Sequence, residues 1–192
     1  MIELTMIRHG RTPGNEEKRY IGATDQPLAQ TGIEAIEQKV KEGLYPKKPD
    51  RIIVSPLKRC IQTTKLIYGE RKFEIIDALK EMNFGIFEGK NFEDLKDDAE
   101  YKAWVDSNCT LPIREGESMA EFTDRVMQGF YEMMSFEKNI KHISRHVVMV
   151  VHGGTIMAIC HSLLGGEYFS YYVENGETVT LYYDRESNSW RK

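Results

Sequence analysis

Residues 4–15 form the stretch LTMIRHGRTPGN, which indicates how the chain folds and where its chemistry lies. Leu4 to Ile7 is a short apolar run without polar alternation. Such runs are typical of strands in parallel sheets that are covered on both faces. Arg8, His9 and Gly10 follow at once, so the predicted strand ends in two side chains that can take part in chemistry.

Two later segments repeat this arrangement. Residues 51–54 (RIIV) precede SPLKR at 55–59, and residues 146–151 (HVVMVV) precede HGG at 152–154. Ligands of open α/β sheets bind outside the carboxyl ends of the strands. If the three strands are parallel, two arginines and two histidines meet at one edge of the sheet: Arg8, His9, Arg59 and His152.

Helical segments separate these strands. The capping-box pattern, Ser or Thr followed three residues later by Glu, occurs at Thr31–Glu34 and Ser118–Glu121 and predicts a helix start at each. Two further helices are expected from Leu57 to Tyr68 and from Thr155 to Leu164, and each ends before a glycine.

The alternation of strands and helices predicts an α/β fold, a three-layer sandwich with a mostly parallel central sheet and helices on both faces. Residues 178–184 are expected to add a late strand. Residues 84–117 are mixed in character and are expected to form short helices across one end of the sheet. We expect residues 1–192 to form a single domain, since the length suits one and no linker-like run interrupts it.

Composition excludes several classes of partner and compartment. The net charge of -4 gives no reason to expect nucleic acid or an anionic membrane as partner. No run approaches the roughly 20 apolar residues of a membrane helix, and the N-terminus lacks the apolar core of a signal peptide. Together with three cysteines that lack metal-ligand spacing, this predicts a soluble cytoplasmic protein with reduced thiols.

No metal or cofactor is expected. His142 and His146 have the i, i+4 spacing of a helical metal site, but no third ligand accompanies them, and we expect a loop there. Two arginines and two histidines are instead suited to bind and cleave a phosphate ester. Arginine offers a fork of donors that fits phosphate oxygens, and a neutral imidazole is a competent nucleophile near pH 7. A phosphohistidine intermediate is therefore plausible chemistry for this edge.

Four motifs in order resemble those of the histidine phosphatase superfamily, the phosphoglycerate mutase-like proteins. They are LTMIRHGRTPGN (4–15), SPLKRCIQTT (55–64), ALKEMNFGIFEG (78–89) and VVHGGTIMAI (150–159). The resemblance implies that His9 is the phosphorylated nucleophile and that Arg8, Arg59 and His152 form the phosphate pocket. It implies that Glu81 is the proton donor and later the base. Further candidate substrate contacts are Asn15, Thr12, Gly22 and Gly153.

The sequence departs from the mutase branch of this family. It has Arg11, Thr12 and Gly14 where mutases usually carry Glu, Ser and Trp, and it is shorter than typical mutases. The run FGIFEG at 84–89 resembles the phosphatase branch, which includes α-ribazole phosphatases. We therefore expect hydrolysis of a small phosphate ester, with α-ribazole 5′-phosphate as one candidate. Phosphoglycerate mutase chemistry and a non-catalytic phospho-ligand-binding protein are the alternatives.

Several assignments stay open from the sequence. Asn15 either contacts phosphate or starts a turn after Gly14. Arg19 and Arg114 either reach the organic part of the substrate or are surface charges. The aromatic residues of the 84–117 segment, Phe84, Tyr101 and Trp104, form either the walls of a substrate pocket or part of the core.

Overall fold

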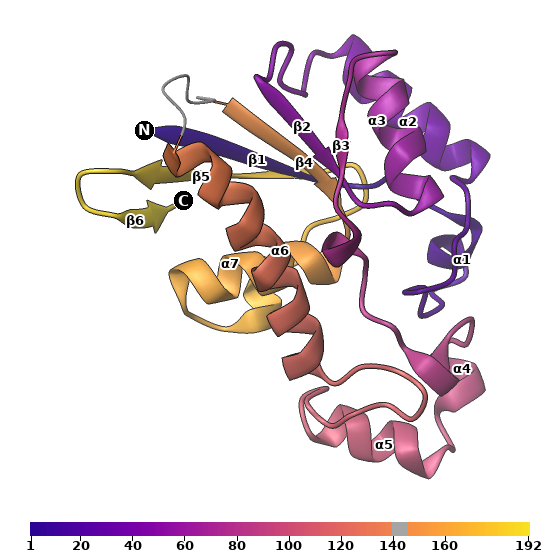
Figure 1. The fold of residues 1–192 in the computed structure, drawn as a ribbon. Coiled ribbons are helices and arrows are strands. Elements are labelled where there is room, and N and C mark those ends of the chain that lie inside the picture. Colours follow the sequence, from indigo (N-terminus) through magenta and orange to yellow (C-terminus); the bar gives the residue numbers. More distant parts are fainter. Residues whose placement is uncertain (140–145) are drawn as a thin grey trace.

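The structure, a computed structural model, describes residues 1–139 and 146–192 and is built around a six-stranded mixed sheet (Figure 1). The strand order is β3-β2-β4-β1-β5-β6, and β5 and β6 are antiparallel to the strands they pair with. The strands are β1 (Ile2–Arg8), β2 (Arg51–Val54), β3 (Glu74–Ile75), β4 (His146–Val151), β5 (Thr178–Asp184) and β6 (Ser189–Arg191).

The three strands expected from their apolar runs lie side by side and are parallel. β4 is in the middle, with β1 on one side and β2 on the other. The register places Arg8 opposite Val151 and Val54 opposite Val150, so the three carboxyl ends coincide. This confirms the predicted meeting of the strand ends at one edge of the sheet.

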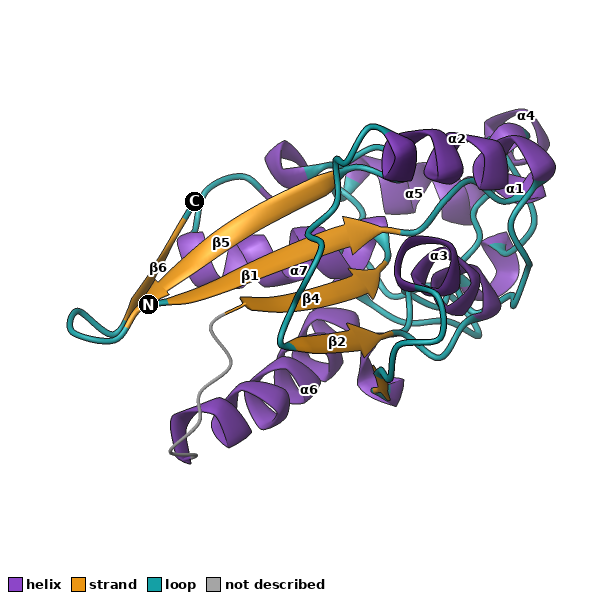
Figure 2. Cartoon of the chain, turned by 90° about the horizontal axis from the view of Figure 1, so that it is seen from above, coloured by secondary structure: helices purple, strands orange, loops and turns teal. Residues whose placement is uncertain are grey.

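Side chains of β4 alternate between two separate apolar layers. Val147, Met149 and Val151 pack into the cluster that contains residues of α6 (Met119–Asn139) and α7 (Gly153–Leu164). Val148 and Val150 pack into the cluster with residues of α2 (Gln30–Lys41) and α3 (Lys58–Tyr68). Figure 2 shows α7 passing behind β1 and β4. The predicted three-layer α/β arrangement is therefore confirmed.

One predicted helix start is right and the other is wrong. At α6 the Ser118 hydroxyl accepts a hydrogen bond from Glu121 N at 3.2 Å, and the Glu121 carboxylate accepts one from Ser118 N at 2.9 Å. Thr31, in contrast, lies inside the first turn of α2, which begins at Gln30, and its hydroxyl bonds to Glu16. Contacts with the loop after β1 set this start, because Ala29 N donates to Arg11 O.

The 84–117 segment forms short helices, as expected, and they lie beside α1 and the start of α6 in Figure 1. The remaining short elements are α1 (Pro13–Glu16), η1 (Asp77–Leu79), η2 (Gly85–Phe87), α4 (Phe92–Leu95), α5 (Ala99–Asp106) and η3 (Tyr168–Tyr171).

Three further expectations concern single residues and the membrane. His142 lies outside the described residues, and His146 is the first residue of β4. The three cysteines are free thiols. Among the helices that the structure describes, none has the length and apolar character needed to cross a membrane.

Candidate active site

His9 follows β1 directly and is buried, with 4% of its surface exposed. Its Nδ1 atom lies 2.7 Å from the carbonyl oxygen of Gly10. Because a carbonyl oxygen can only accept, the hydrogen bond requires the proton of the neutral ring on Nδ1. The lone pair is then on Nε2, which makes this atom the nucleophilic end of the imidazole.

The surroundings of His9 keep its ring uncharged. Burial lowers its pKa well below the ordinary value, and the positive charges of Arg59 and Arg8 lower it further. The hydrogen bond to Gly10 acts in the opposite direction but does not outweigh burial. A neutral imidazole with a free Nε2 lone pair is the form that can attack an electrophile.

His152 lies next to His9, with 5.1 Å between the ring centroids and the rings nearly edge to face. Arg59 Nε donates to His152 Nδ1 at 3.2 Å, so the ring proton is on Nε2. This proton is donated to the Ser55 hydroxyl, 2.7 Å away. His152 is fully buried, and burial together with the charge of Arg59 lowers its pKa. It is therefore held neutral in one tautomer.

Arg59 is fully buried, and its orientation is set by the loop at residues 22–24, which follows the first motif. Its terminal nitrogens donate to the backbone carbonyls of Thr24 and Gly22, each at 2.8 Å. A side chain at Gly22 would not fit there, since a Cβ atom would lie 1.6 Å from the carbonyl oxygen of Met82. Gly22 thus has a steric role in the site, and its carbonyl orients Arg59.

Arg8 has one paired and one unpaired donor in its guanidinium group. Its Nη1 atom donates to the carbonyl of Val173 at 2.7 Å, and its guanidinium lies 5.3 Å from the ring centroid of Tyr172. Its Nε atom is buried, and no residue in the described part of the chain accepts a hydrogen bond from it. Gly153 leaves room for Arg8, because a Cβ there would lie 3.2 Å from the guanidinium carbon. A buried donor without a partner is rare in native proteins, and a bound anion is one group that would satisfy it.

Glu81 lies between the backbone of its own segment and the N-terminus of α7. Its carboxylate accepts hydrogen bonds from Gly154 N at 2.9 Å and from Met82 N at 3.0 Å. Burial nevertheless raises its pKa, against the lowering effect of these bonds and of the two arginines. A raised pKa favours the protonated carboxyl group, which is the form that can donate a proton.

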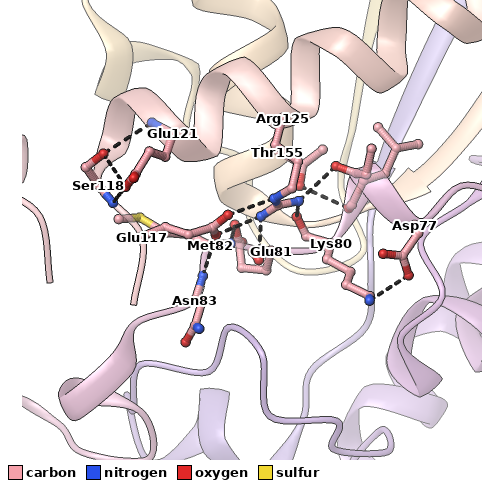
Figure 3. A network of polar contacts seen from close by, with 12 residues as sticks. Asp77, Lys80, Glu81, Met82, Asn83, Glu117, Ser118, Glu121, Arg125 and Thr155 are labelled. Carbon is pink, nitrogen blue, oxygen red and sulfur yellow. Dashed lines mark hydrogen bonds and ion pairs between the residues drawn. The ribbon is translucent and has the colours of Figure 1, made fainter. Parts of the chain in front are cut away.

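The segment that contains Glu81 is fastened by Arg125 of α6, as Figure 3 shows. Arg125 donates to the carbonyls of Ala78 and Lys80 at 2.9 and 3.2 Å and to the carbonyl of Glu81 at 3.3 Å. Its guanidinium also pairs with Glu117 at 2.7 Å. The sequence analysis did not identify Arg125, and its position in an amphipathic helix gives no signal of this role.

Asn15 and Thr12 form a reciprocal cap at the start of α1. Asn15 N lies 3.3 Å from the Thr12 hydroxyl, and Thr12 N donates to Asn15 Oδ1 at 3.1 Å. Thr12 is fully buried, whereas Asn15 lines a cavity next to Arg8 and Glu81. Asn15 therefore starts a turn, and it also lines the cavity, while its contact with phosphate stays a prediction.

This cavity has a volume of about 360 Å³, and both polar and apolar residues line it. Of the predicted site residues, Arg8, Asn15, Glu81 and Gly153 line it, whereas His9, Arg59 and His152 are buried and are not among its lining residues. Its aromatic lining residues are Tyr20, Phe84, Trp104, Phe122, Tyr168, Phe169 and Tyr172.

The structure shows where the aromatic residues and arginines lie whose roles the sequence left open. Phe84 lines the cavity, and Trp104 both lines it and belongs to the core, while Tyr101 belongs to the core and bonds through its hydroxyl to Tyr20. Arg19 lines the cavity but is paired with Glu17 and Asp94. Arg114 pairs with Glu100 at the surface.

Two acceptors of the site were also missed from the sequence. Ser55, which holds His152, stands in the second motif directly after β2, so its position was a usable signal. Glu88 accepts hydrogen bonds from the backbone of Gly22 and Ala23 and from Phe84 N, and so ties the loop that orients Arg59 to the third motif. Sequence spacing does not reveal this contact.

Comparison with known proteins identifies the class. Residues 4–192 match the model of the histidine phosphatase superfamily (branch 1). The chain belongs to this superfamily, which confirms the resemblance drawn from the four motifs and makes the protein a phosphatase by class.

The similar proteins include phosphatases of two named kinds. The chain is 31% identical to the adenosylcobalamin/α-ribazole phosphatase of Escherichia coli K12, over 85% of its own length and 80% of that protein. The crystal structure of the α-ribazole phosphatase from Shigella flexneri has 27% identity, a TM-score of 0.83 and coverage of 99% and 95% of the two chains. A phosphoserine phosphatase mutant from Entamoeba histolytica, in complex with phosphoserine, has 27% identity, a TM-score of 0.82 and coverage of 100% and 94%.

The contact between Ser55 and His152 yields the first prediction. Ser55→Ala removes the acceptor of the buried Nε2 proton, and an unsatisfied buried donor costs about 1–3 kcal/mol. We expect the free energy of unfolding to fall by this amount, measured by urea denaturation with an unchanged slope. Ser187→Ala, at an exposed serine, is the control. Equal effects of both changes would contradict the role given to Ser55.

Proposed function

We propose that this protein is a phosphomonoesterase that works through a phosphohistidine on His9, with Glu81 as general acid and base and without a metal ion. The observation that supports this most is the hydrogen bond from His9 Nδ1 to Gly10 O, which leaves the lone pair on Nε2. This lone pair belongs to a ring kept neutral by burial, beside an arginine with an unpaired buried donor.

In the first step the Nε2 lone pair attacks phosphorus. The bond between phosphorus and the ester oxygen breaks, its electron pair goes to that oxygen, and the Glu81 carboxyl protonates it. The raised pKa of Glu81 favours the protonated form that this step needs. The alcohol leaves, and the phosphoryl group stays on His9.

In the second step water attacks the phosphorus of the phosphohistidine. Glu81, now a carboxylate, takes a proton from this water, and the nitrogen–phosphorus bond breaks with its electron pair returning to Nε2. Arg8 and Arg59 stabilise the charge on the equatorial oxygens in both steps, with Asn15 as a further donor. His152 contributes to the same pocket and keeps Arg59 oriented through the 3.2 Å contact.

The nucleophile is tested by replacing it. His9→Ala is expected to lower the turnover of p-nitrophenyl phosphate by more than about a thousandfold, because no other group is placed to accept the phosphoryl group. The wild-type enzyme should keep its activity in EDTA and should retain labelled phosphate on His9 after an acid-free quench. His146→Gln, at the far end of β4, is the control and should leave turnover unchanged.

Other outcomes of these assays identify the alternatives. Interconversion of 2- and 3-phosphoglycerate without release of phosphate would identify a mutase instead. A wild-type protein that binds phosphate esters without turnover or labelling of His9 would be a phospho-ligand-binding protein. Loss of activity in EDTA would contradict the proposed absence of a metal.

The acid is tested by the leaving group and by pH. Glu81→Gln is expected to lower kcat by about a hundred- to ten-thousandfold for an alkyl phosphate and much less for p-nitrophenyl phosphate, whose leaving group needs little protonation. As pH rises through the raised pKa of Glu81, the wild-type kcat for the alkyl ester should fall, and the variant should lack this alkaline limb. As pH falls through 6.5 the wild-type activity should persist, since the pKa of His9 is lower still. Equal losses on both esters would contradict the role of Glu81.

The cavity favours a substrate whose leaving alcohol carries an aromatic ring. Seven of its eighteen lining residues are aromatic, and its volume of about 360 Å³ is within the range of small-molecule sites. Trp104 is one of them, and its indole N–H is buried without a hydrogen-bond partner within the described residues. Among the esters named for similar proteins, α-ribazole 5′-phosphate has an aromatic base and phosphoserine has none, so we propose the former as the candidate substrate.

A comparison of kcat/KM tests this assignment. We expect α-ribazole 5′-phosphate to be hydrolysed with a higher kcat/KM than phosphoserine. Phe169→Ala, at a lining residue that is 53% exposed, should raise KM for the aromatic ester by up to about tenfold and leave phosphoserine unaffected. Phe92→Ala, at a phenylalanine that is 60% exposed and outside the cavity lining, is the matched control. A higher kcat/KM for phosphoserine would contradict the assignment.

A further inference from the structure

The segment 172–177, between η3 and β5, contacts the end of β1 and several predicted phosphate ligands. Gly176 N donates to the carbonyl oxygens of Arg8 and His9 at 3.0 and 3.2 Å. The carbonyl of Val173 receives the Arg8 guanidinium. No motif of the sequence analysis includes this segment, yet it lies against the nucleophile and its neighbouring arginine.

Asn175 is the residue of this segment that contacts both the backbone of His9 and the side chain of Asn15. Its Nδ2 atom lies 3.1 Å from the carbonyl oxygen of His9 and 3.3 Å from Asn15 Oδ1. Because the His9 carbonyl can only accept, the atom that faces it must be the amide nitrogen. The backbone of the nucleophile therefore determines which way the Asn175 amide points.

The orientation of Asn15 is determined in the same way from its other side. Thr12 N, which can only donate, lies 3.1 Å from Asn15 Oδ1. With Thr12 N and Asn175 Nδ2 as donors, both lone pairs of Oδ1 are used. Asn15 lines the cavity next to Arg8 and Glu81, so its amide has only N–H groups left to offer to a ligand there.

We propose that Asn175 is a positioning residue that holds the Asn15 amide with its N–H groups available to the phosphoryl group. This inference rests on the proposed function, in which Asn15 is a phosphate donor. Without Asn175, one hydrogen bond from Thr12 N would hold Oδ1, and the amide could turn its oxygen towards the anion. An oxygen facing a phosphate oxygen repels it, whereas an N–H group forms a charge-assisted hydrogen bond.

A double-mutant cycle tests the proposal with p-nitrophenyl phosphate as substrate and inorganic phosphate as competitive inhibitor. Asn15→Ala should raise the Ki of phosphate by about tenfold or more, and Asn175→Ala by about three- to tenfold. If Asn175 acts through Asn15, adding Asn175→Ala to Asn15→Ala should change Ki by less than about twofold. Independent effects that multiply in the double variant would overturn the proposal.

A second substitution keeps the test valid if Asn175→Ala lowers stability. Asn175→Asp has nearly the same shape but replaces the donor by an oxygen, which would face the acceptors of His9 and Asn15. We expect it to raise Ki more than Asn175→Ala does, while a role in stability alone would leave Ki unchanged once both variants are shown to be folded by their Tm. Glu174→Gln, at the exposed neighbouring residue, should change neither quantity.

The test of Asn175 and the test of the proposed function can fail independently. Labelling of His9 in the wild-type enzyme and its loss in His9→Ala test the reaction, and neither depends on Asn175. If the labelling succeeds and the two asparagine effects multiply, the phosphatase mechanism stands and the positioning role fails. If His9 is never labelled, the proposed function fails whatever the cycle shows.

Discussion

The parallel register of β1, β4 and β2 is the constraint on which the site depends. Arg8 is opposite Val151 and Val150 is opposite Val54, so His9, His152 and Ser55 each follow a strand that ends at the same level. Because the strands are buried on both faces, a shift in register would break apolar packing on two layers together. The packing of the core and the placement of His9, the proposed nucleophile, therefore depend on the same hydrogen-bonded ladder.

Burial has opposite consequences for the two kinds of titratable group at this edge. It lowers the pKa of His9 and His152 and raises that of Glu81, so each group is shifted towards its uncharged form. The arginines reinforce the effect on the histidines and oppose it on Glu81. Two groups whose pKa values move in opposite directions suit the parts of nucleophile and acid. Because these histidines, Glu81 and the two arginines lie together in a buried cluster, the proposed chemistry needs no further charged group.

The site residues are held largely by backbone carbonyls and amides of other segments. Arg59 is held by carbonyls of the loop at 22–24, and the segment of Glu81 is held by Arg125. Backbone groups have fixed donor or acceptor character, so they determine the ring tautomers of His9 and the amide orientation of Asn175. The cavity is lined in part by residues of the 84–117 segment and of η3, and Glu88 of that segment also holds the loop that orients Arg59, so the cavity wall and the predicted phosphate ligands are linked.

The sequence by itself determined the three central strands, the α/β class and the family, because apolar runs, glycines and short motifs are local patterns. It also placed Arg8, His9, Arg59, Glu81 and His152 in these motifs, and the structure brings them together. The start of α2, the partners of Arg19 and the contacts of Ser55, Arg125 and Asn175 were decided only by the tertiary structure. Each of these depends on a partner far away in the chain, such as the 166 positions between His9 and Asn175. Hydrogen bonds over such separations leave no periodic or compositional pattern in one sequence, since either partner alone is an ordinary polar residue.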